Sequence, residues 1–336
     1  MRYTIRKKLI SKFTDMKHQV LFFGDLHGGF DHCLAIVEQY RPKAIVLLGD
    51  LEAPEPLQNM FDEVRKLTEV WWIHGNHDTD KEHYYTNLYD SEMADFNLDG
   101  RVAEIAGLRI AGLGGVFRGK IWHPNDACWN YFSHEDYIKD AHPRQLWNGG
   151  VSLRNRSSIF PETYMALRCQ KADILVSHEA PSCNRFGFSV LDRLARQMGV
   201  SAVFHGHHHD NYDYSLHFER MGFETYSVGL RGVCALDGTV LKPGEEDGLN
   251  ECRIARCSQL FYCFLEMMMQ EKFVRVEGMT CNNCVKHVSE ALSEIAGVES
   301  VDVSLDKAGA TIRSAGDIDI EVIRTALDEA GYDLVD

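Results

Sequence analysis

The most constraining feature of this sequence is a pattern that recurs five times between residues 20 and 210. A short, unbroken apolar run ends each time in a small group of polar residues. Apolar runs without polar interruption are typical of strands that are buried on both faces of a sheet. The pattern therefore predicts sheets whose strands end in clusters of polar side chains. The five runs are Val20–Phe23, Ala44–Leu48, Val70–Ile73, Ile174–Val176 and Ala202–Phe204.

Helical patterns lie between several of these runs, which favours an α/β fold with helices layered on the sheet. Two other segments, Val102–Gly114 and Phe223–Val240, have the pattern of hairpins, so we expect a mixed rather than a purely parallel sheet. The expected helices cover Phe30–Tyr40, Leu57–Leu67, Thr163–Cys169 and Val190–Met198.

Length and charge limit the possible functions. The chain of 336 residues is long enough for two domains. Its formal net charge of −15 argues against duplex nucleic acid as the main partner, because binding to a phosphate backbone depends on Lys and Arg. No apolar run approaches the ~20 residues of a membrane span, and no apolar signal segment follows the basic stretch Met1–Lys17. We therefore expect a cytoplasmic protein with no membrane partner.

The polar groups after the five runs contain side chains that suit metal ions. Two carboxylates, one amide and four histidines fit a pair of divalent cations of intermediate hardness. Cations ~3.5–4 Å apart are suited to hydrolysis at phosphorus, because the attacking and the leaving oxygen both need stabilisation. The candidate ligands are Asp25, His27, Asp50, Asn76, His178, His207 and His209.

In this order, the clusters resemble those of the calcineurin-like metallophosphoesterase family over roughly residues 20–240. The resemblance implies a four-layer αββα sandwich for residues 1–241, with Asp50 bridging two cations (Mn, Fe or Zn). A hydroxide that bridges these cations would be the nucleophile. The family pattern gives Asp25, His27 and His209 to the first cation, and Asn76, His178 and His207 to the second.

The third cluster also contains two residues to which the resemblance gives catalytic roles. His77 matches the family histidine that is not a ligand and that assists departure of the leaving oxygen. Asp78 would orient His77. We expect Glu52 and His74, which adjoin these motifs, to be supporting residues rather than ligands.

The second cluster departs from that of the serine/threonine protein phosphatases. Those enzymes have the motif Gly-Asp-x-Val-Asp-Arg-Gly, whereas this chain reads Gly49-Asp50-Leu51-Glu52-Ala53, so the phosphate-binding arginine of that motif is missing. A generic phosphoesterase is therefore favoured over a protein phosphatase. Arginines that could replace the missing one, or that are ordinary surface or lid residues, are Arg118, Arg154, Arg156 and Arg231.

Residues 117–161 interrupt the pattern with an irregular segment that is rich in aromatic residues. A long irregular insertion in a compact domain is often a functional lid. The alternative interpretation is a subdomain with a small core of its own, and both can hold. We expect this insertion to set the choice of substrate, which is a small phosphoester or a nucleotide.

A second domain is expected at residues 271–336, after a linker at residues 242–270. Its pattern of strand, helix, strand, strand, helix and strand is the ferredoxin-like α+β arrangement. Cys281 and Cys284 lie between the first strand and the first helix, where two thiolates three positions apart suit a soft ion such as Cu(I). The run Gly278-Met279-Thr280-Cys281-Asn282-Asn283-Cys284 and the order of elements resemble the heavy-metal-associated domain of copper chaperones and metal-pumping ATPases.

Together these features predict a phosphatase or phosphodiesterase that carries a soft-metal-binding module. A metal-binding or metal-trafficking protein, in which the first domain is a scaffold, is the alternative. A third interpretation is a phosphoesterase that is regulated by metal at the cysteine pair. A protein that donates or accepts metal is a possible partner in each case.

Overall fold

A computed structural model describes residues 13–126, 128–247, 270–280, 282–293, 295, 298–314 and 318–335. The chain separates into two compact units, residues 1–250 and 251–336. Most of the predicted linker, residues 248–269, lies outside the described residues, as does Cys281. Each unit is described by itself below.

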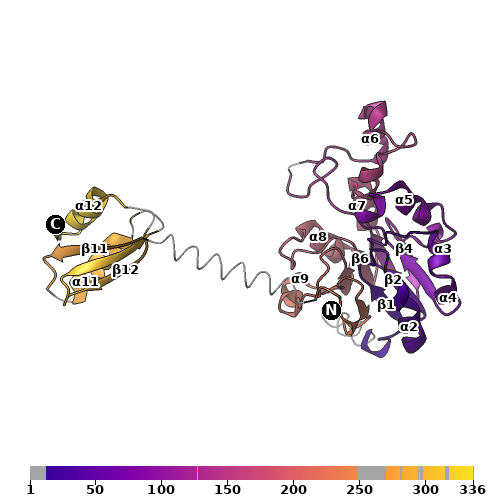
Figure 1. The fold of residues 1–336 in the computed structure, drawn as a ribbon, viewed down its shortest axis with the longest axis horizontal. Helices are drawn as coiled ribbons and strands as arrows, with labels where there is room; N and C mark the ends of the chain where they lie inside the picture. Colours follow the sequence, from indigo (N-terminus) through magenta and orange to yellow (C-terminus); the bar gives the residue numbers. More distant parts are fainter. Residues whose placement is uncertain are drawn as a thin grey trace. The chain divides into compact units, whose positions relative to one another are not determined.

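The first unit contains two mixed five-stranded sheets (Figure 1). In the first sheet, three parallel strands form one side, and two antiparallel strands extend it beyond β1. Its order is β10 (Val240–Lys242), β9 (Val233–Ala235), β1 (Val20–Phe23), β2 (Ala44–Leu47) and β3 (Glu69–Trp72).

The second sheet is built in the same way from a hairpin and three further strands. The strands β4 and β5 form the antiparallel hairpin predicted for residues 102–114, and β5 to β8 run parallel. The order is β4 (Val102–Ile105), β5 (Leu108–Leu113), β6 (Ile174–Ser177), β7 (Ala202–His205) and β8 (Glu224–Ser227).

Helices cover the outer face of each sheet. The helices packed on the first sheet are α2 (Asp31–Tyr40), α3 (Leu57–Met60), α4 (Asp62–Arg65) and α5 (Glu82–Tyr89). Those that follow the hairpin of the second sheet are α6 (His134–Asp140), α7 (Pro161–Arg168), α8 (Ser189–Met198) and α9 (Phe218–Met221).

Strand β1 shows how its sequence produces the layers. Successive side chains of a strand point to opposite faces, so Leu21 and Phe23 pack with the helices, while Val20 and Phe22 pack between the sheets. The ring of Phe22 stacks on that of Phe204 in β7, with centroids 3.7 Å apart. All four residues of β1 are fully buried, which explains the unbroken apolar run. The predicted four-layer arrangement is confirmed.

Two details of the predicted fold are wrong. The segment 223–240 is not a hairpin, because β8 belongs to the second sheet whereas β9 and β10 belong to the first. The helix expected over residues 57–67 is divided into α3 and α4 at Phe61, whose φ of −114° and ψ of 15° leave the helical range. Hydrophobic periodicity identifies strands, but it does not say which sheet each strand joins.

The described residues of the insertion at residues 117–161 share a hydrophobic core with the rest of the first unit. It contains α6 and two 3-10 turns, η3 (Pro143–Gln145) and η4 (Leu153–Ser157). Phe117, Trp122 and Tyr137 are buried in the same hydrophobic cluster as side chains of α7, α8 and the second sheet. The insertion therefore extends the helical layer on this sheet.

In its described residues, the second unit forms a four-stranded antiparallel sheet with two helices, and its βαββαβ order confirms the prediction. The sheet order is β12–β13–β11–β14. Val276, Val288, Ile312 and Leu327 lie in its buried core. Its elements are β11 (Gln270–Glu277), α11 (Asn282–Ser293), β12 (Val298–Ser304), β13 (Gly309–Ser314), α12 (Ile320–Glu329) and β14 (Asp333–Val335).

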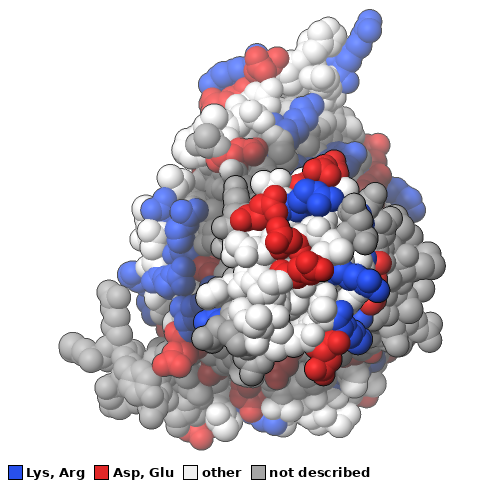
Figure 2. All heavy atoms as spheres, turned by 90° about the vertical axis from the view of Figure 1, so that its left-hand side faces the viewer, with Lys and Arg blue, Asp and Glu red and all other residues white. Residues whose placement is uncertain are grey.

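The surface carries charges of both signs. Although the formal net charge of the chain is −15, Lys and Arg side chains lie beside Asp and Glu side chains on the face shown in Figure 2. In the part of the chain that the structure describes, no helix is both long and apolar enough to cross a membrane.

Candidate metal centre

The predicted ligands lie where strands of the two sheets end. Because parallel strands end at the same edge of a sheet, the residues that follow them are neighbours in space. The two sheets are stacked, so the edge of one lies beside the edge of the other. Asp25 and His27 follow β1, Asp50 follows β2, Asn76 follows β3, His178 follows β6, and His207 and His209 follow β7.

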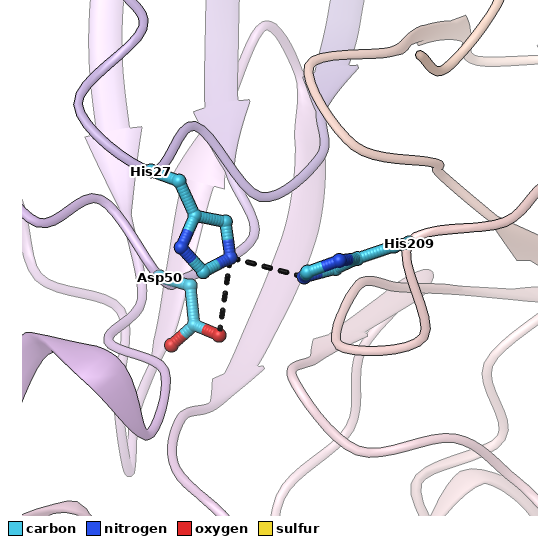
Figure 3. A group of neighbouring side chains, drawn as sticks. All are labelled: His27, Asp50 and His209. Carbon is cyan, nitrogen blue, oxygen red and sulfur yellow. Dashed lines mark hydrogen bonds and ion pairs between the residues drawn. The ribbon is translucent and has the colours of Figure 1, made fainter. Parts of the chain in front are cut away.

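The first group of candidate ligands is His27, Asp50 and His209 (Figure 3). Their ligand atoms all lie within 4.8 Å of one another. His27 Nε2 is 3.0 Å from His209 Nε2 and 3.8 Å from Asp50 Oδ2. Asp25 is adjacent, with Oδ2 3.9 Å from His209 Nε2. One proton on either ring would join the two nitrogens in a hydrogen bond, and a cation would instead accept the lone pairs of both.

The second group is Asp50, His178 and His207, with the same spacing limit of 4.8 Å. His178 Nδ1 lies 2.8 Å from the carbonyl oxygen of Leu48, which makes Nδ1 the donor and leaves the Nε2 lone pair free in the neutral ring. That lone pair faces two further acceptors, Asp50 Oδ2 at 3.3 Å and Asn76 Oδ1 at 3.2 Å. Three acceptors that converge in this way need a proton or a cation between them.

Asp50 is the residue that both groups share. Its Oδ1 accepts a hydrogen bond of 2.7 Å from the backbone N–H of His77. Its Oδ2 is buried and forms no hydrogen bond with the residues that the structure describes, and His178 Nε2 lies 3.3 Å away. A buried carboxylate oxygen without a partner is costly, and coordination by a cation removes that cost. The donor set therefore fits two cations with Asp50 between them.

The electrostatics of the centre also call for positive charge. Burial raises the pKa of Asp25. Burial opposes the charged form of Asp50 as well, but the neighbouring His178 and the His77 N–H outweigh it and lower the pKa. For His178, the cost of burial is outweighed by Asp50 and Asp25, which raise its pKa to about 10. The raised pKa of His178 reflects the negative charge that Asp50 and Asp25 concentrate here, and divalent cations would balance that same charge.

The backbone is strained at several of the candidate ligands. The φ values are 42° at His27, 48° at Asp50, 71° at His207 and 59° at His209. These values lie in the left-handed region, which residues other than glycine rarely adopt. Each such residue costs about 1–3 kcal/mol, and residues of this kind concentrate at functional sites. The strain supports a function for these four positions.

The contacts of His77 and Asp78 differ from the expectation. His77 Nδ1 lies 2.6 Å from Asp80 Oδ2, so Asp80 rather than Asp78 holds the ring. The carboxylate of Asp78 is buried and accepts the backbone N–H groups of Gly75 and Glu52, both at 2.8 Å. Asp78 therefore fixes the turn that carries Asn76 and His77 instead of orienting the imidazole.

Three further acidic residues that are not candidate ligands lie at the centre. Asp80 contacts His77, and Glu52 contacts His27 Nδ1. Glu179 Oε2 lies 3.9 Å from His207 Nε2, and burial raises the pKa of Glu179 to about 7. The sequence contained one sign that such residues lie near the centre: Glu52 and Glu179 are each within two residues of a candidate ligand.

In the second unit, the structure describes one of the two predicted thiol ligands. Cys284 lies in the first turn of α11, and its Sγ is 3.8 Å from Thr280 Oγ1. Met279 packs against the hydrophobic core of this unit. A Cβ added to Gly278 would lie 3.5 Å from the ring of Tyr332, which places Tyr332 beside this loop.

Comparison with known proteins assigns both units. Residues 18–211 match the family model of the calcineurin-like phosphoesterases, and residues 273–333 match the heavy-metal-associated domain. An uncharacterized protein of Haemophilus influenzae is 40% identical over 222 residues, which cover 66% of this chain and 96% of that protein. The copper chaperone CopZ of Staphylococcus epidermidis is 34% identical over 67 residues, or 20% of this chain and 98% of the chaperone.

A solved structure, described as the CopZ metallochaperone, is 32% identical and matches 20% of this chain and 100% of its own, with a TM-score of 0.19. The family model of the phosphoesterases spans more than half of the chain, and the Haemophilus protein is matched over nearly its whole length. The chain therefore belongs to the calcineurin-like phosphoesterase family and carries a heavy-metal-associated domain at residues 273–333.

Proposed function

We propose that the first unit hydrolyses phosphoesters with two divalent cations, such as Mn, Fe or Zn. The observation that carries this proposal is Asp50, which belongs to two His/Asp groups at once and whose buried Oδ2 forms no hydrogen bond with the described residues. Asp25, His27 and His209 would hold one cation, and Asn76, His178 and His207 the other. When bound, such a pair lowers the pKa of a shared water and stabilises charge on the phosphoryl oxygens.

His77 supplies a proton to the leaving oxygen in this proposal. Its side chain is 44% exposed and its Nδ1 is paired with Asp80, so Nε2 is available to a substrate. Partial burial lowers the pKa of His77, but the hydrogen bond to Asp80 and the charge of Asp50 outweigh it and raise the pKa. A raised pKa keeps more of the ring protonated near neutral pH, as a general acid requires.

The proposal predicts hydrolysis of simple phosphoesters. The purified protein, supplied in turn with Mn²⁺, Zn²⁺ or Fe²⁺, should release nitrophenol from 4-nitrophenyl phosphate or from its bis(4-nitrophenyl) diester. A chelator should abolish the release, and the same cation should restore it. The proposal is rejected if no cation supports hydrolysis of any mono- or diester above the rate of the Asp50→Asn protein.

Cation binding should also stabilise the first unit, because it neutralises the buried carboxylates. At a free Mn²⁺ concentration of about 100 times Kd, the stabilisation is about 2.7 kcal/mol, which for a unit of this size corresponds to roughly 5–10 °C in Tm. Differential scanning fluorimetry with and without chelator measures this shift. The Asp50→Asn protein should show little of it, and an equal shift in that variant would contradict the assigned site.

We infer further that the second unit binds a soft cation of the Cu(I) type through Cys281 and Cys284. The position of Cys284 in the first turn of α11 supports this, because a helix N-terminus favours the thiolate. Cys284→Ser should weaken Cu(I) binding at least about 100-fold, since loss of even an outer-shell partner of a metal ligand costs about 10–100-fold. Competition with a chromogenic Cu(I) chelator measures the affinity.

The exposed Cys169 of the first unit provides a matched control, and Cys169→Ser should leave Cu(I) affinity unchanged. The same proteins test whether metal at the cysteine pair regulates hydrolysis. Equal phosphoesterase activity with and without Cu(I) would exclude that regulation, whereas a change that disappears in Cys284→Ser would favour it. Metal trafficking without hydrolysis is favoured only if Cu(I) binds and no phosphoester is cleaved.

A further inference from the structure

The four arginines that could contact a phosphate differ in how many of their donors are already used by protein groups. The guanidinium of Arg231 donates to the carbonyl oxygens of Leu26 and His27, at 3.0 and 3.2 Å, and pairs with Glu245 at 2.7 Å. Its donors are thus used to hold the loop that carries His27. Arg231 is a structural residue of the centre and is not available to a substrate.

Arg156 is also engaged by protein groups. It donates to Tyr85 Oη at 2.8 Å and to the carbonyl oxygen of Val151 at 3.2 Å. Its guanidinium lies over the rings of Tyr85 and Trp147, 5.0 and 4.8 Å from their centroids. These contacts tie the insertion to α5, and they leave Arg118 and Arg154 as the remaining candidates.

Arg118 is anchored beside the metal centre. The backbone N–H of the preceding Phe117 donates to Glu179 Oε1 at 3.1 Å, next to the candidate ligand His178. Arg118 Nη1 donates to Ser157 Oγ at 3.0 Å and to Ser158 Oγ at 3.3 Å. These contacts hold one edge of the guanidinium and leave Nε and Nη2 for another acceptor.

Ser157 connects Arg118 to the turn that carries the proposed catalytic histidine. Its Oγ lies 2.6 Å from Thr79 Oγ1, and Thr79 ends the 3-10 turn η1 (His77–Thr79). Asp80, which holds His77, is close enough to Arg118 for its charge to act on the guanidinium, as are Glu179 and Asp50. Arg118 is therefore linked through Ser157 to the turn that carries His77.

Arg118 and Arg154 are both cations, and the carboxylates of Asp80, Glu179 and Asp50 act on Arg118 only from beyond ion-pair distance among the described residues. Within the described ranges, neither side chain forms an ion pair, and Arg154 has no side-chain hydrogen bond. Arg118 is partly buried, and the charge of Arg154 acts on it unfavourably. Partial burial of an unpaired cation beside a second one is costly, and an anion bound by both would remove the cost.

We propose that Arg118, assisted by Arg154, binds non-bridging oxygens of a phosphomonoester at the metal centre and so favours monoesters over diesters. This inference rests on the proposed phosphoesterase function. A monoester carries nearly two negative charges at neutral pH, whereas a diester carries one and has one oxygen fewer to offer. The planar fork of an arginine matches two phosphoryl oxygens, which a lysine does not.

The experiment compares one dianionic with one monoanionic substrate. Wild type, Arg118→Gln, Arg118→Lys and Arg154→Gln are assayed with Mn²⁺ on 4-nitrophenyl phosphate and on bis(4-nitrophenyl) phosphate. Arg118→Gln should lower kcat/KM for the monoester by about 10–100-fold, as expected for a charge-assisted bidentate contact, and for the diester by less than about threefold. Arg118→Lys should recover part of the monoester activity, and Arg154→Gln should show a smaller, equally selective loss.

Arg144→Gln is the matched control, since Arg144 is exposed in the same insertion and should leave both substrates unaffected. Equal Tm values of wild type and Arg118→Gln separate a binding defect from a folding defect. Equal losses on both esters, or no loss on either, would overturn the inference and leave the proposed function standing. If wild type cleaves neither ester, the proposed function fails, and calorimetric titration with inorganic phosphate tests Arg118 alone: binding equal in wild type and Arg118→Gln overturns the anion site.

Discussion

Asp50→Asn should lower kcat/KM for a phosphoester at least about 100-fold, because the substitution removes the one charge that both candidate cation groups share. Asparagine can still accept the hydrogen bond from the His77 N–H, so the turn that follows β3 should keep its conformation. The main loss is therefore in cation binding. Elemental analysis of the purified variant should find both divalent ions depleted, while Cu(I) binding at the second unit stays intact.

Asp62→Asn on the exposed helix α4 serves as the matched control, since it removes a carboxylate outside the centre. That variant should retain wild-type activity and metal content. Full activity in Asp50→Asn with both cations still bound would remove the basis for assigning this residue as the bridge.

His77→Ala should have the second largest effect, a decrease in kcat of about 10²–10⁴-fold, which is the usual contribution of a general acid. The size of this decrease in kcat should depend on the leaving group of the substrate. An alkyl phosphate needs a proton on its departing oxygen, so it should suffer most. Nitrophenolate leaves without one, so 4-nitrophenyl phosphate should be affected least. Measuring kcat for both esters with wild type and variant gives the comparison.

Metal content distinguishes a general acid from a metal ligand at position 77. If His77 is a general acid, His77→Ala should retain both cations. Asp80→Asn should give a smaller loss with the same dependence on the leaving group, since the hydrogen-bond contact of Asp80 is with His77. Equal losses for the alkyl and the nitrophenyl ester, or depletion of a cation in His77→Ala, would contradict a general-acid role.

The strands that position the centre were predictable because their side chains are buried on both faces. Val20–Phe23 shows this most simply, since four buried residues produce an uninterrupted apolar run with the same limits as β1. Polar residues then follow at the point where each strand leaves the core. The sequence therefore indicates which residues lie at the edge of a sheet, even without knowledge of which strands pair.

Pairing and local contacts were harder to predict. The strand β8 joins the second sheet and β9 joins the first, because the intervening residues 228–232 cross from one sheet to the other, and no hydrophobic pattern marks that crossing. The partner of His77 depends on the geometry of a single 3-10 turn. That turn brings Asp80, three positions along, to the imidazole and directs Asp78 to backbone N–H groups instead.

The division of the ligands between the two sheets has a mechanical consequence. His27, Asp50 and Asn76 follow strands of the first sheet, whereas His178, His207 and His209 follow strands of the second. A cation held by either group therefore crosslinks the sheets at one end of the sandwich. Away from that end, packing such as the Phe22–Phe204 stack joins them. Loss of the cations would release the end that carries the candidate metal centre while the hydrophobic core stays closed, so metal supply would set how rigidly the two halves of that centre are held together.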